Sequence, residues 1–422
     1  MSHAATRPTS LAPHPPAEVL DRLYDPTIVF LAGALMTLGV AMVYSASVTV
    51  EGAGFNWREW WNSPLKQGIF ALAGFLVMII AAHVDYRVLA WDRPGRGWRA
   101  GLLAALAVTA LVLVFVPGIG RMAGGARRSI FLYTGPPAVQ FQPSEFAKVV
   151  LVIWLAALLT RPTGPAVASR LRSWRPWRRG PGPEILRGDV RDFRSGFVPV
   201  VLSGGLLIGL TGIEDFGTAA LMGLVMVILL FAARARWLHL GLIGVLGLVA
   251  GGVLLFGEQY RLDRIRTFFS EAPDPAGAGY QINQALLAIG SGGWYGRGLG
   301  AGVQKYGYLP QRNNDFILAI ICEELGVVGG MVVVALFLAL LWRGWRIAVH
   351  APDMFGRLLA LGLTLTICFQ AAMNIGVVTN SIPTKGISLP FVSAGGSGVV
   401  FLGLAAGLLA AVGRRSKPAL GE

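Results

Sequence analysis

Apolar residues in this chain are grouped into runs of about 20, separated by shorter polar segments. A helix needs about 20 apolar residues to cross the hydrocarbon core of a bilayer. The runs predict an all-α polytopic membrane protein with about ten transmembrane helices. We expect these spans at residues 27–47, 66–83, 99–117, 144–160, 196–212, 217–233, 238–257, 316–342, 357–378 and 394–413.

The charge of the polar segments predicts which side of the membrane each one faces. Residues 161–195 carry nine arginines against three acids, and segments rich in Lys and Arg remain in the cytoplasm. An even number of spans places both ends of the chain on one side. We therefore predict a disordered cytoplasmic tail at 1–24, a cytoplasmic loop at 161–195 and a cytoplasmic tail at 414–422, around one membrane domain at 25–413.

Composition supports a membrane protein and argues against several other classes. Hydrophobic residues make up 54% of the 422 residues and charged residues 14%, against about 25% charged residues in soluble domains. The formal charge of +14 lies mostly on the predicted cytoplasmic segments, so we expect no nucleic-acid partner. Cys322 and Cys368 lie in apolar runs, and the five histidines are scattered. No metal site is therefore predicted.

The outer loop at 258–315, between spans 7 and 8, is the longest, and loops of this length are usually functional. Residues 261–269 and 281–289 have helical spacing of apolar positions. We expect short helices that lie on the membrane surface.

Asp315 lies where this loop meets the next apolar run. It is either the N-cap of the eighth span or a general base, because a carboxylate near apolar surface has a raised pKa and can accept a proton. Glu323 and Glu324 follow about 12–13.5 Å further along a helix. They are too distant to pair with Asp315, so we expect them to join helices or to line a cavity.

Three basic residues on the predicted outer side suit an anionic ligand. Lys385 lies in a segment whose Pro and Gly residues interrupt any helix, and irregular backbone at membrane depth must line a cavity or be buried in protein. Arg127 and Arg128 are adjacent, and guanidinium groups bind phosphate oxygens well. The expected ligand is a lipid that carries phosphate and a polar head.

The fourth and sixth spans begin with charged residues that have two interpretations. Ser144 and Glu145 could cap and stabilise the start of a helix, or Glu145 could belong to the site. Lys148 lies deeper and needs a partner, for which Glu145 is one candidate. A role as helix N-cap would account for Asp215. Alternatively, Glu214 and Asp215 could line a central cavity.

Seven motifs in order resemble those of the SEDS family, which includes FtsW, RodA and SpoVE, with PTKG before SLP closest to the FtsW branch. They are MVYSAS (42–47), GARR (125–128), QPSEFAK (142–148), DFGTA (215–219), YQINQALLAIGSGG with GRGLGAGVQK (280–305), LP…NDF…EELG (309–326) and NIGV…PTKGISLP…SAGGSG (374–398). The segments PQRNNDF and SAGGSG depart from the family's usual residues, although Asp315 is retained.

The resemblance implies a peptidoglycan glycosyltransferase of the bacterial cytoplasmic membrane that polymerises lipid II at its outer face, in cell division. Asp315 would be the catalytic base in an inverting transfer from undecaprenyl diphosphate. The implied partners are a class B penicillin-binding protein, a transpeptidase, and other divisome membrane proteins. The implied substrate-binding residues are Lys385, Arg127, Arg128, Glu145, Lys148, Gln304, Lys305, Ser393 and Ser397.

Two alternatives and one cofactor remain open at this point. The chain could be a lipid II flippase, which needs polar groups from one leaflet to the other, or a non-catalytic scaffold that recruits a transpeptidase. A divalent cation could assist the diphosphate, although the sequence has no metal-binding cluster.

Overall fold

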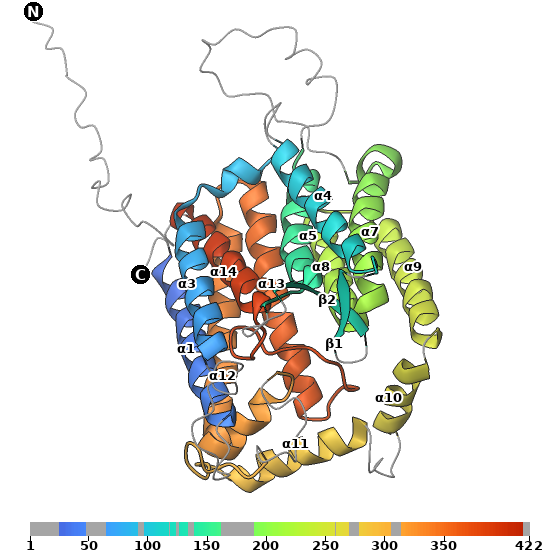
Figure 1. Cartoon of the computed structure of the whole chain (residues 1–422). Helices are drawn as coiled ribbons and strands as arrows, with labels where there is room; N and C mark the ends of the chain where they lie inside the picture. Colours follow the sequence, from blue (N-terminus) through green and yellow to red (C-terminus); the bar gives the residue numbers. More distant parts are fainter. Residues whose placement is uncertain are drawn as a thin grey trace, which may run out of the picture.

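The computed structural model of the chain describes residues 25–47, 65–91, 97–117, 119–123, 126–133, 139–161, 190–257, 259–269, 278–304 and 314–416. Within these residues, a helix occupies each of the ten positions where the apolar pattern predicts a span (Figure 1). They are α1 (Pro26–Ser47), α3 (Lys66–His83), α4 (Trp98–Leu113), α5 (Pro143–Leu159), α7 (Val198–Glu214), α8 (Phe216–Ala232), α9 (Trp237–Phe256), α12 (Ile317–His350), α13 (Met354–Val378) and α14 (Ser397–Arg415).

The polytopic helical fold is therefore confirmed. Six of these helices, α1, α3, α9, α12, α13 and α14, are long and apolar enough to cross a membrane, and α4, α7 and α8 are shorter apolar helices. The number of ten spans stays a prediction. The tail 1–24, most of the loop 161–195 and residues 417–422 lie outside the described residues.

Local sequence explains where several helices begin and end. Asp215 is the N-cap of α8, and its carboxylate accepts a hydrogen bond from the Thr218 amide at 3.1 Å. Ser144 was the wrong cap for α5, because that helix begins one residue earlier, at Pro143, a residue suited to the first helical position. The eighth span runs past the predicted end at 342 to His350, because arginine is a good helix former and the next proline along the chain is Pro352.

Small residues allow the closest helix packing in the bundle. A β-carbon placed on Gly403 of α14 would lie 2.3 Å from the carbonyl oxygen of Gly74 on α3, and one on Gly407 would lie 2.3 Å from that of Met78. Glycines at such contacts let helix backbones approach in a membrane. α5 and α13 are mostly buried, and α13 packs against α5, α8, α12 and α14.

The first and last helices begin and end at the same end of the bundle. The Asp25 amide donates to the carbonyl of Ala410 in α14 at 3.3 Å, and its carboxylate accepts from Arg343 at 2.7 Å. The two ends of the membrane domain thus lie on one side, as the even number of spans predicts. That this side is cytoplasmic stays a prediction.

Asp353 joins two elements at this same end, α13 and the short 3-10 helix Tyr86–Leu89. Its carboxylate caps α13 through the Gly356 amide, and it accepts from the buried Tyr86 hydroxyl at 2.6 Å and from Arg87 at 3.1 Å. We expect Asp353→Ala to lower the free energy of unfolding by about 2–4 kcal/mol, because it removes a cap and leaves a buried hydroxyl without an acceptor. Thermal unfolding in detergent measures the loss.

Asp353→Asn is the matched variant, because asparagine also caps helices. It should lose less stability than Asp353→Ala. Equal losses in the two variants would show that the cap contributes nothing.

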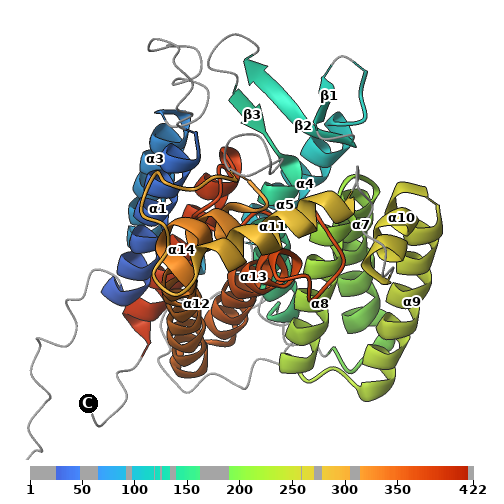
Figure 2. The ribbon, with the colours of Figure 1, turned by 90° about the horizontal axis from the view of Figure 1, so that it is seen from below.

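The opposite end of the bundle carries the predicted loop helices. α10 (Gln259–Phe269) and α11 (Ala278–Gly292) occupy the two stretches with helical spacing. In Figure 1, α11 lies across the end of the bundle, and Figure 2 shows it crossing over the ends of α12 and α13.

This end also holds a small sheet, which corrects the purely helical prediction. β1 (Gly120–Ala123), β2 (Ala126–Tyr133) and β3 (Val139–Phe141) form an antiparallel sheet in the order β1–β2–β3. Ala123 pairs with Ala126, and two glycines separate them in the sequence. Gly-Gly between strands is a common hairpin pattern, which the predominance of apolar runs obscured.

Candidate functional site

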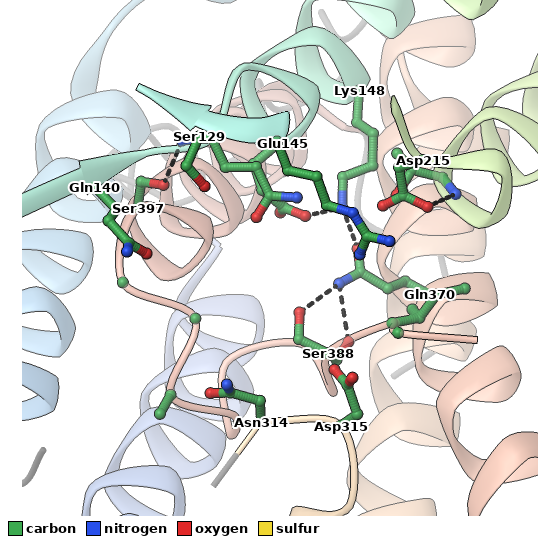
Figure 3. Close-up of a pocket in the computed structure, with 18 of the residues that line it drawn as sticks. Ser129, Gln140, Glu145, Lys148, Asp215, Asn314, Asp315, Gln370, Ser388 and Ser397 are labelled. Atoms are coloured by element: carbon green, nitrogen blue, oxygen red, sulfur yellow. Dashed lines mark hydrogen bonds and ion pairs between the residues drawn. The ribbon is translucent and has the colours of Figure 1, made fainter. Parts of the chain in front are cut away.

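A cavity of about 630 Å³ opens among the elements at the α11 end of the bundle. Its lining comes from β2, β3, α3, α5, α8, α10, α11, α13 and the start of α14, from Asn314 and Asp315, and from the irregular segment 379–396 that follows α13. Figure 3 shows polar side chains from these elements directed into one space. Much of this lining is polar, which at this depth in an apolar bundle indicates a binding site.

Asp315 lies on the wall of this cavity (Figure 3). Its backbone carbonyl accepts a hydrogen bond from Asn374 of α13 at 2.7 Å, and the same amide group also donates to the carbonyl of Ile387 at 2.7 Å. One buried side chain thus fixes Asp315 relative to the segment 379–396.

The structure does not support the capping interpretation of Asp315. Phe316 occupies the N-cap position of α12, without a side-chain capping bond. Among the described residues, no group donates a hydrogen bond to the Asp315 carboxylate. Its oxygens are therefore available to a ligand in the cavity.

Two arginines set the electrostatics of Asp315. Burial raises the pKa of Asp315 to about 6, and the positive charges of Arg128 and Arg264 oppose this shift while Asp215 adds to it. Arg128 on β2 and Arg264 on α10 both line the cavity. A carboxylate with this pKa is ionised at neutral pH yet basic enough to accept a proton.

Gly386 explains how Arg128 and Asp315 can share one space. A β-carbon placed on Gly386 would lie 3.2 Å from Asp315 Oδ2 and 3.5 Å from Arg128 Nη1. Both charged groups therefore face the same stretch of backbone, and a side chain there would occupy the space between them.

The charged residues at the start of α5 form a buried network. Lys148 Nζ donates to Glu145 Oε1 at 2.8 Å and also to Gln370 Oε1, and Gln370 Nε2 donates to the carbonyl of Ser388 at 3.0 Å. The interpretation of Glu145 as the partner of Lys148 is confirmed. All four residues line the cavity, so the network forms part of its wall.

Lys385 lies beside the cavity and is not among its lining residues. Its ammonium group is 5.1 Å from the centre of the Phe216 ring, a cation–π contact at the start of α8. Burial lowers the pKa of Lys385, and the Asp215 carboxylate opposes this shift. A role for Lys385 toward a ligand stays a prediction.

The other predicted binding residues are distributed differently. Ser397 lines the cavity, and its hydroxyl accepts from the Gln142 amide at 3.1 Å. Ser393 is buried away from the lining, and its hydroxyl donates to the Asn314 carbonyl at 2.6 Å. The Arg127 backbone belongs to β2, but its side chain, like all of Lys305, lies outside the described part of the chain.

Gln304 lies at a different place, beside Glu323 and Glu324 of α12. The Glu323 carboxylate accepts from the Val303 amide at 2.7 Å and from the Gln304 amide at 3.2 Å, while the Glu324 carboxylate accepts from the Gly300 amide at 3.1 Å. Both glutamates are fully buried and absent from the cavity lining. They attach the segment after α11 to α12.

A break in α12 makes this attachment possible. Gly326 has a φ of 73°, a left-handed conformation that glycine adopts without steric cost. The carbonyls of Glu323 and Glu324 accept instead from the amides of Arg297 and Gly298, both at 3.0 Å. The break therefore connects the segment after α11 to the helix that follows Asp315.

Several residues of this site were not predicted from the sequence, among them Asn374, Gln370 and Arg264. Asn374 and Gln370 are polar side chains within the apolar run of α13, and polar groups at membrane depth are costly enough to indicate a role. Arg264 was predicted to lie on a short helix at the membrane surface, together with its neighbours in the sequence. Only the tertiary structure brings α10 against the cavity.

The described residues contain no cluster of three or more His, Cys, Asp and Glu side chains arranged for a metal ion. Glu145, Asp215 and Asp315 line the cavity as carboxylates. A divalent cation held jointly with a phosphate ligand stays an untested prediction.

The chain is similar to curated proteins over most of its length. The chain is 38% identical over 397 residues to the probable peptidoglycan glycosyltransferase FtsW of Geobacter sp. (strain M18), covering 94% of this chain and 98% of that protein. It is 37% identical over 396 residues to stage V sporulation protein E of Bacillus subtilis (strain 168), covering 93% and 98%.

A solved structure has the same fold. It is described as "Structural coordination of polymerization and crosslinking by a peptidoglycan synthase complex", and one of its chains aligns with a TM-score of 0.68 and 24% identity, covering 93% of this chain and 98% of that chain.

The family model described as "Cell cycle protein", FTSW_RODA_SPOVE, matches residues 26–418. This match includes α1 to α14 and every element of the cavity. The chain is a multi-pass protein of the bacterial cytoplasmic membrane and belongs to the FtsW/RodA/SpoVE family.

Proposed function

We propose that this protein is a peptidoglycan glycosyltransferase that polymerises lipid II at the outer face of the membrane, in cell division. The observation that carries the proposal is the Asp315 carboxylate, which faces a polar cavity beside Arg128 and Arg264 and has a pKa of about 6. The names of the relatives support the reaction class.

In the proposed reaction, Asp315 removes the proton from the 4-hydroxyl of the acceptor GlcNAc as that oxygen attacks C1 of the donor MurNAc. The bond between C1 and the diphosphate oxygen breaks, and undecaprenyl diphosphate leaves with the electron pair. Because the attack comes from the face opposite the leaving group, the configuration at C1 is inverted. Arg128 and Arg264 stabilise the negative charge that develops on the diphosphate, which is the electrostatic part of the catalysis.

The remaining wall of the cavity suits a sugar ring. Four polar residues from other elements also line the cavity: Gln67, Gln140, Gln142 and Ser397. Their amide and hydroxyl groups can donate hydrogen bonds to sugar hydroxyls and accept hydrogen bonds from them. Phe70 offers an apolar surface beside them. Both charge and hydrogen-bonding groups are thus available to a lipid-linked saccharide.

We infer that a class B penicillin-binding protein is the partner, together with other divisome membrane proteins. The solved structure with the same fold is described as part of a peptidoglycan synthase complex that combines polymerisation and crosslinking. That description supports a transpeptidase partner for this chain.

The proposed function is tested with purified protein, alone and with its cognate transpeptidase, supplied with labelled lipid II. We expect glycan chains on a gel in at least the paired reaction. Scrambling of lipid II across vesicles without glycan chains would favour a flippase, and neither activity under any pairing would favour a scaffold. Either outcome would overturn the proposal.

The activity should depend on pH through Asp315. Because the pKa of Asp315 is about 6, its carboxylate is ionised above that pH, so the rate should fall as pH decreases through about 6. The charge of Arg128 lowers this pKa. Arg128→Gln should therefore move the acidic limb of the rate profile to higher pH, in addition to lowering the maximum rate.

The position of the limb distinguishes this effect from a simple loss of binding. Arg414→Gln, at the far end of the bundle, is the matched charge removal and should leave the limb unchanged. An Arg128→Gln profile with an unshifted limb would show that Arg128 does not influence the base.

A further inference from the structure

A second cavity lies at the opposite end of α8 from the Asp315 site. It has a volume of about 520 Å³ and is lined by Arg191, Phe231, Arg234, Ala235, Arg236 and Trp237. α8 begins beside Asp215 of the first site and has 17 residues, which correspond to about 25 Å of helix. The second cavity is thus on the side that the arginine distribution predicts to be cytoplasmic.

The lining of this cavity is strongly cationic. It includes three arginines, from the segment before α7 and from the turn between α8 and α9, and none of the six lining residues is acidic. Arg191 Nε donates to the Arg234 carbonyl at 3.5 Å, so the two segments meet here. Guanidinium groups are well suited to phosphate oxygens.

The segment that carries Arg191 is held against α9 by buried contacts. The His239 ring stacks on the Phe197 ring at 4.4 Å, and His239 Nδ1 lies 3.2 Å from the Val190 carbonyl oxygen. Val190 and His239 are both buried. Arg191 therefore has a defined place next to the α8–α9 turn.

The backbone at Arg234 is in a conformation that its side chain does not favour. Arg234 has a φ of 64°, at a helix end where glycine or asparagine is usual. The hydrogen bonds of the turn, Ala233 to Leu229 and Ala235 to Leu230, would form equally well around glycine. Strained residues of this kind cluster at functional sites.

An apolar surface continues from the cavity along α9. Phe231 is 54% exposed, Trp237 77% and Leu238 84%, and Val245 and Val249 are exposed further along the helix. Figures 1 and 2 both show α9 at the edge of the bundle. Tryptophan at the start of such a helix is typical of the level of lipid headgroups.

We propose that this cavity binds the phosphate headgroup of an anionic glycerophospholipid of the cytoplasmic leaflet, with its acyl chains along α9. The arginines match the phosphate, and the exposed face of α9 matches the chains. A free phosphate would need the first feature but would gain nothing from the second. Basic pockets between membrane helices on the cytoplasmic side bind acidic lipids in this way.

Native mass spectrometry of the full-length protein tests the proposal, with phosphatidylglycerol or phosphatidylcholine added to the detergent-purified sample. Wild type should retain phosphatidylglycerol in preference to phosphatidylcholine. Arg234→Gln/Arg236→Gln should reduce this retention about 10-fold or more, because each basic residue near a membrane surface adds appreciable attraction. Arg99→Gln/Arg414→Gln removes the same charge outside the cavity and should change retention little.

Arg234→Gly separates binding from folding. Glycine adopts a positive φ without steric strain, so this variant should unfold at a temperature equal to or above that of wild type. It should nevertheless retain less phosphatidylglycerol. Equal retention in wild type and in both cavity variants would overturn the proposal. Displacement of the bound species by inorganic phosphate as readily as by lipid would overturn the lipid assignment.

Discussion

Asp315→Asn should reduce glycan polymerisation by about 10²–10⁴-fold, the usual contribution of a general base. Asparagine has the shape of aspartate but cannot accept the proton of a sugar hydroxyl. The Asn374 bond to residue 315 uses the backbone carbonyl, so the loop should keep its place. The measurement is the initial rate of glycan formation from labelled lipid II with the transpeptidase partner present.

Two controls make this prediction specific. Asp263→Asn changes an exposed carboxylate of α10 that contacts Arg266, and it should leave the rate within about threefold of wild type. Thermal unfolding of Asp315→Asn should match wild type or exceed it, because a partly buried carboxylate without a hydrogen-bond donor is removed. A stable Asp315→Asn protein that polymerises at nearly the wild-type rate would place the base elsewhere.

Lys148→Met should destabilise the bundle by about 3–5 kcal/mol, because it leaves the Glu145 carboxylate buried without its countercharge. Lys148 is 3% exposed and Glu145 7%, and Glu145 Oε2 has no hydrogen-bond partner among the described residues. The substitution also removes the donor to Gln370 Oε1. Unfolding in detergent, by heat or denaturant, measures the loss.

A double variant tests whether the pair or the lysine alone carries this effect. Glu145→Gln/Lys148→Met removes both charges and should recover most of the lost stability, because buried ion pairs are often replaced at little cost. If the double variant is as unstable as Lys148→Met, the instability arises from packing and not from charge. Activity that stays low in a stable double variant would assign the Glu145–Lys148 pair a role toward the substrate as well.

The helical fold could be predicted because lipid imposes one local rule on every span. Backbone groups in hydrocarbon must be satisfied within the segment, so run length alone located the ten helices, within a few residues in most cases. The eighth span shows the limit of this rule. Arg343 ends the apolar run but not the helix, because a helix stops at a breaker and not at a change of polarity.

The site was predictable only where one residue is exceptional by itself. Asp315 and Arg128 were recognised as charges next to apolar runs, and the structure brings both to one cavity. Lys385 met the same criterion, but it contacts Phe216. Ser393 was implied by the family resemblance, but its hydroxyl joins two backbone segments. Which face of a loop a side chain occupies depends on packing that the sequence pattern does not contain.

The sequence by itself determined the class of protein, the order of its spans and the carboxylate at the start of the eighth one, since these follow from local hydropathy and from motifs along the chain. The tertiary structure alone decided that Arg264, Asn374 and Gln370 belong to the site and that Glu323 and Glu324 join segments of the chain and do not line the cavity. The physical reason is that these assignments depend on contacts between helices far apart in the chain, such as the Asn374 amide that holds both Asp315 and Ile387. Local sequence patterns determine where the helices form, whereas packing between the helices determines which side chains meet in the site.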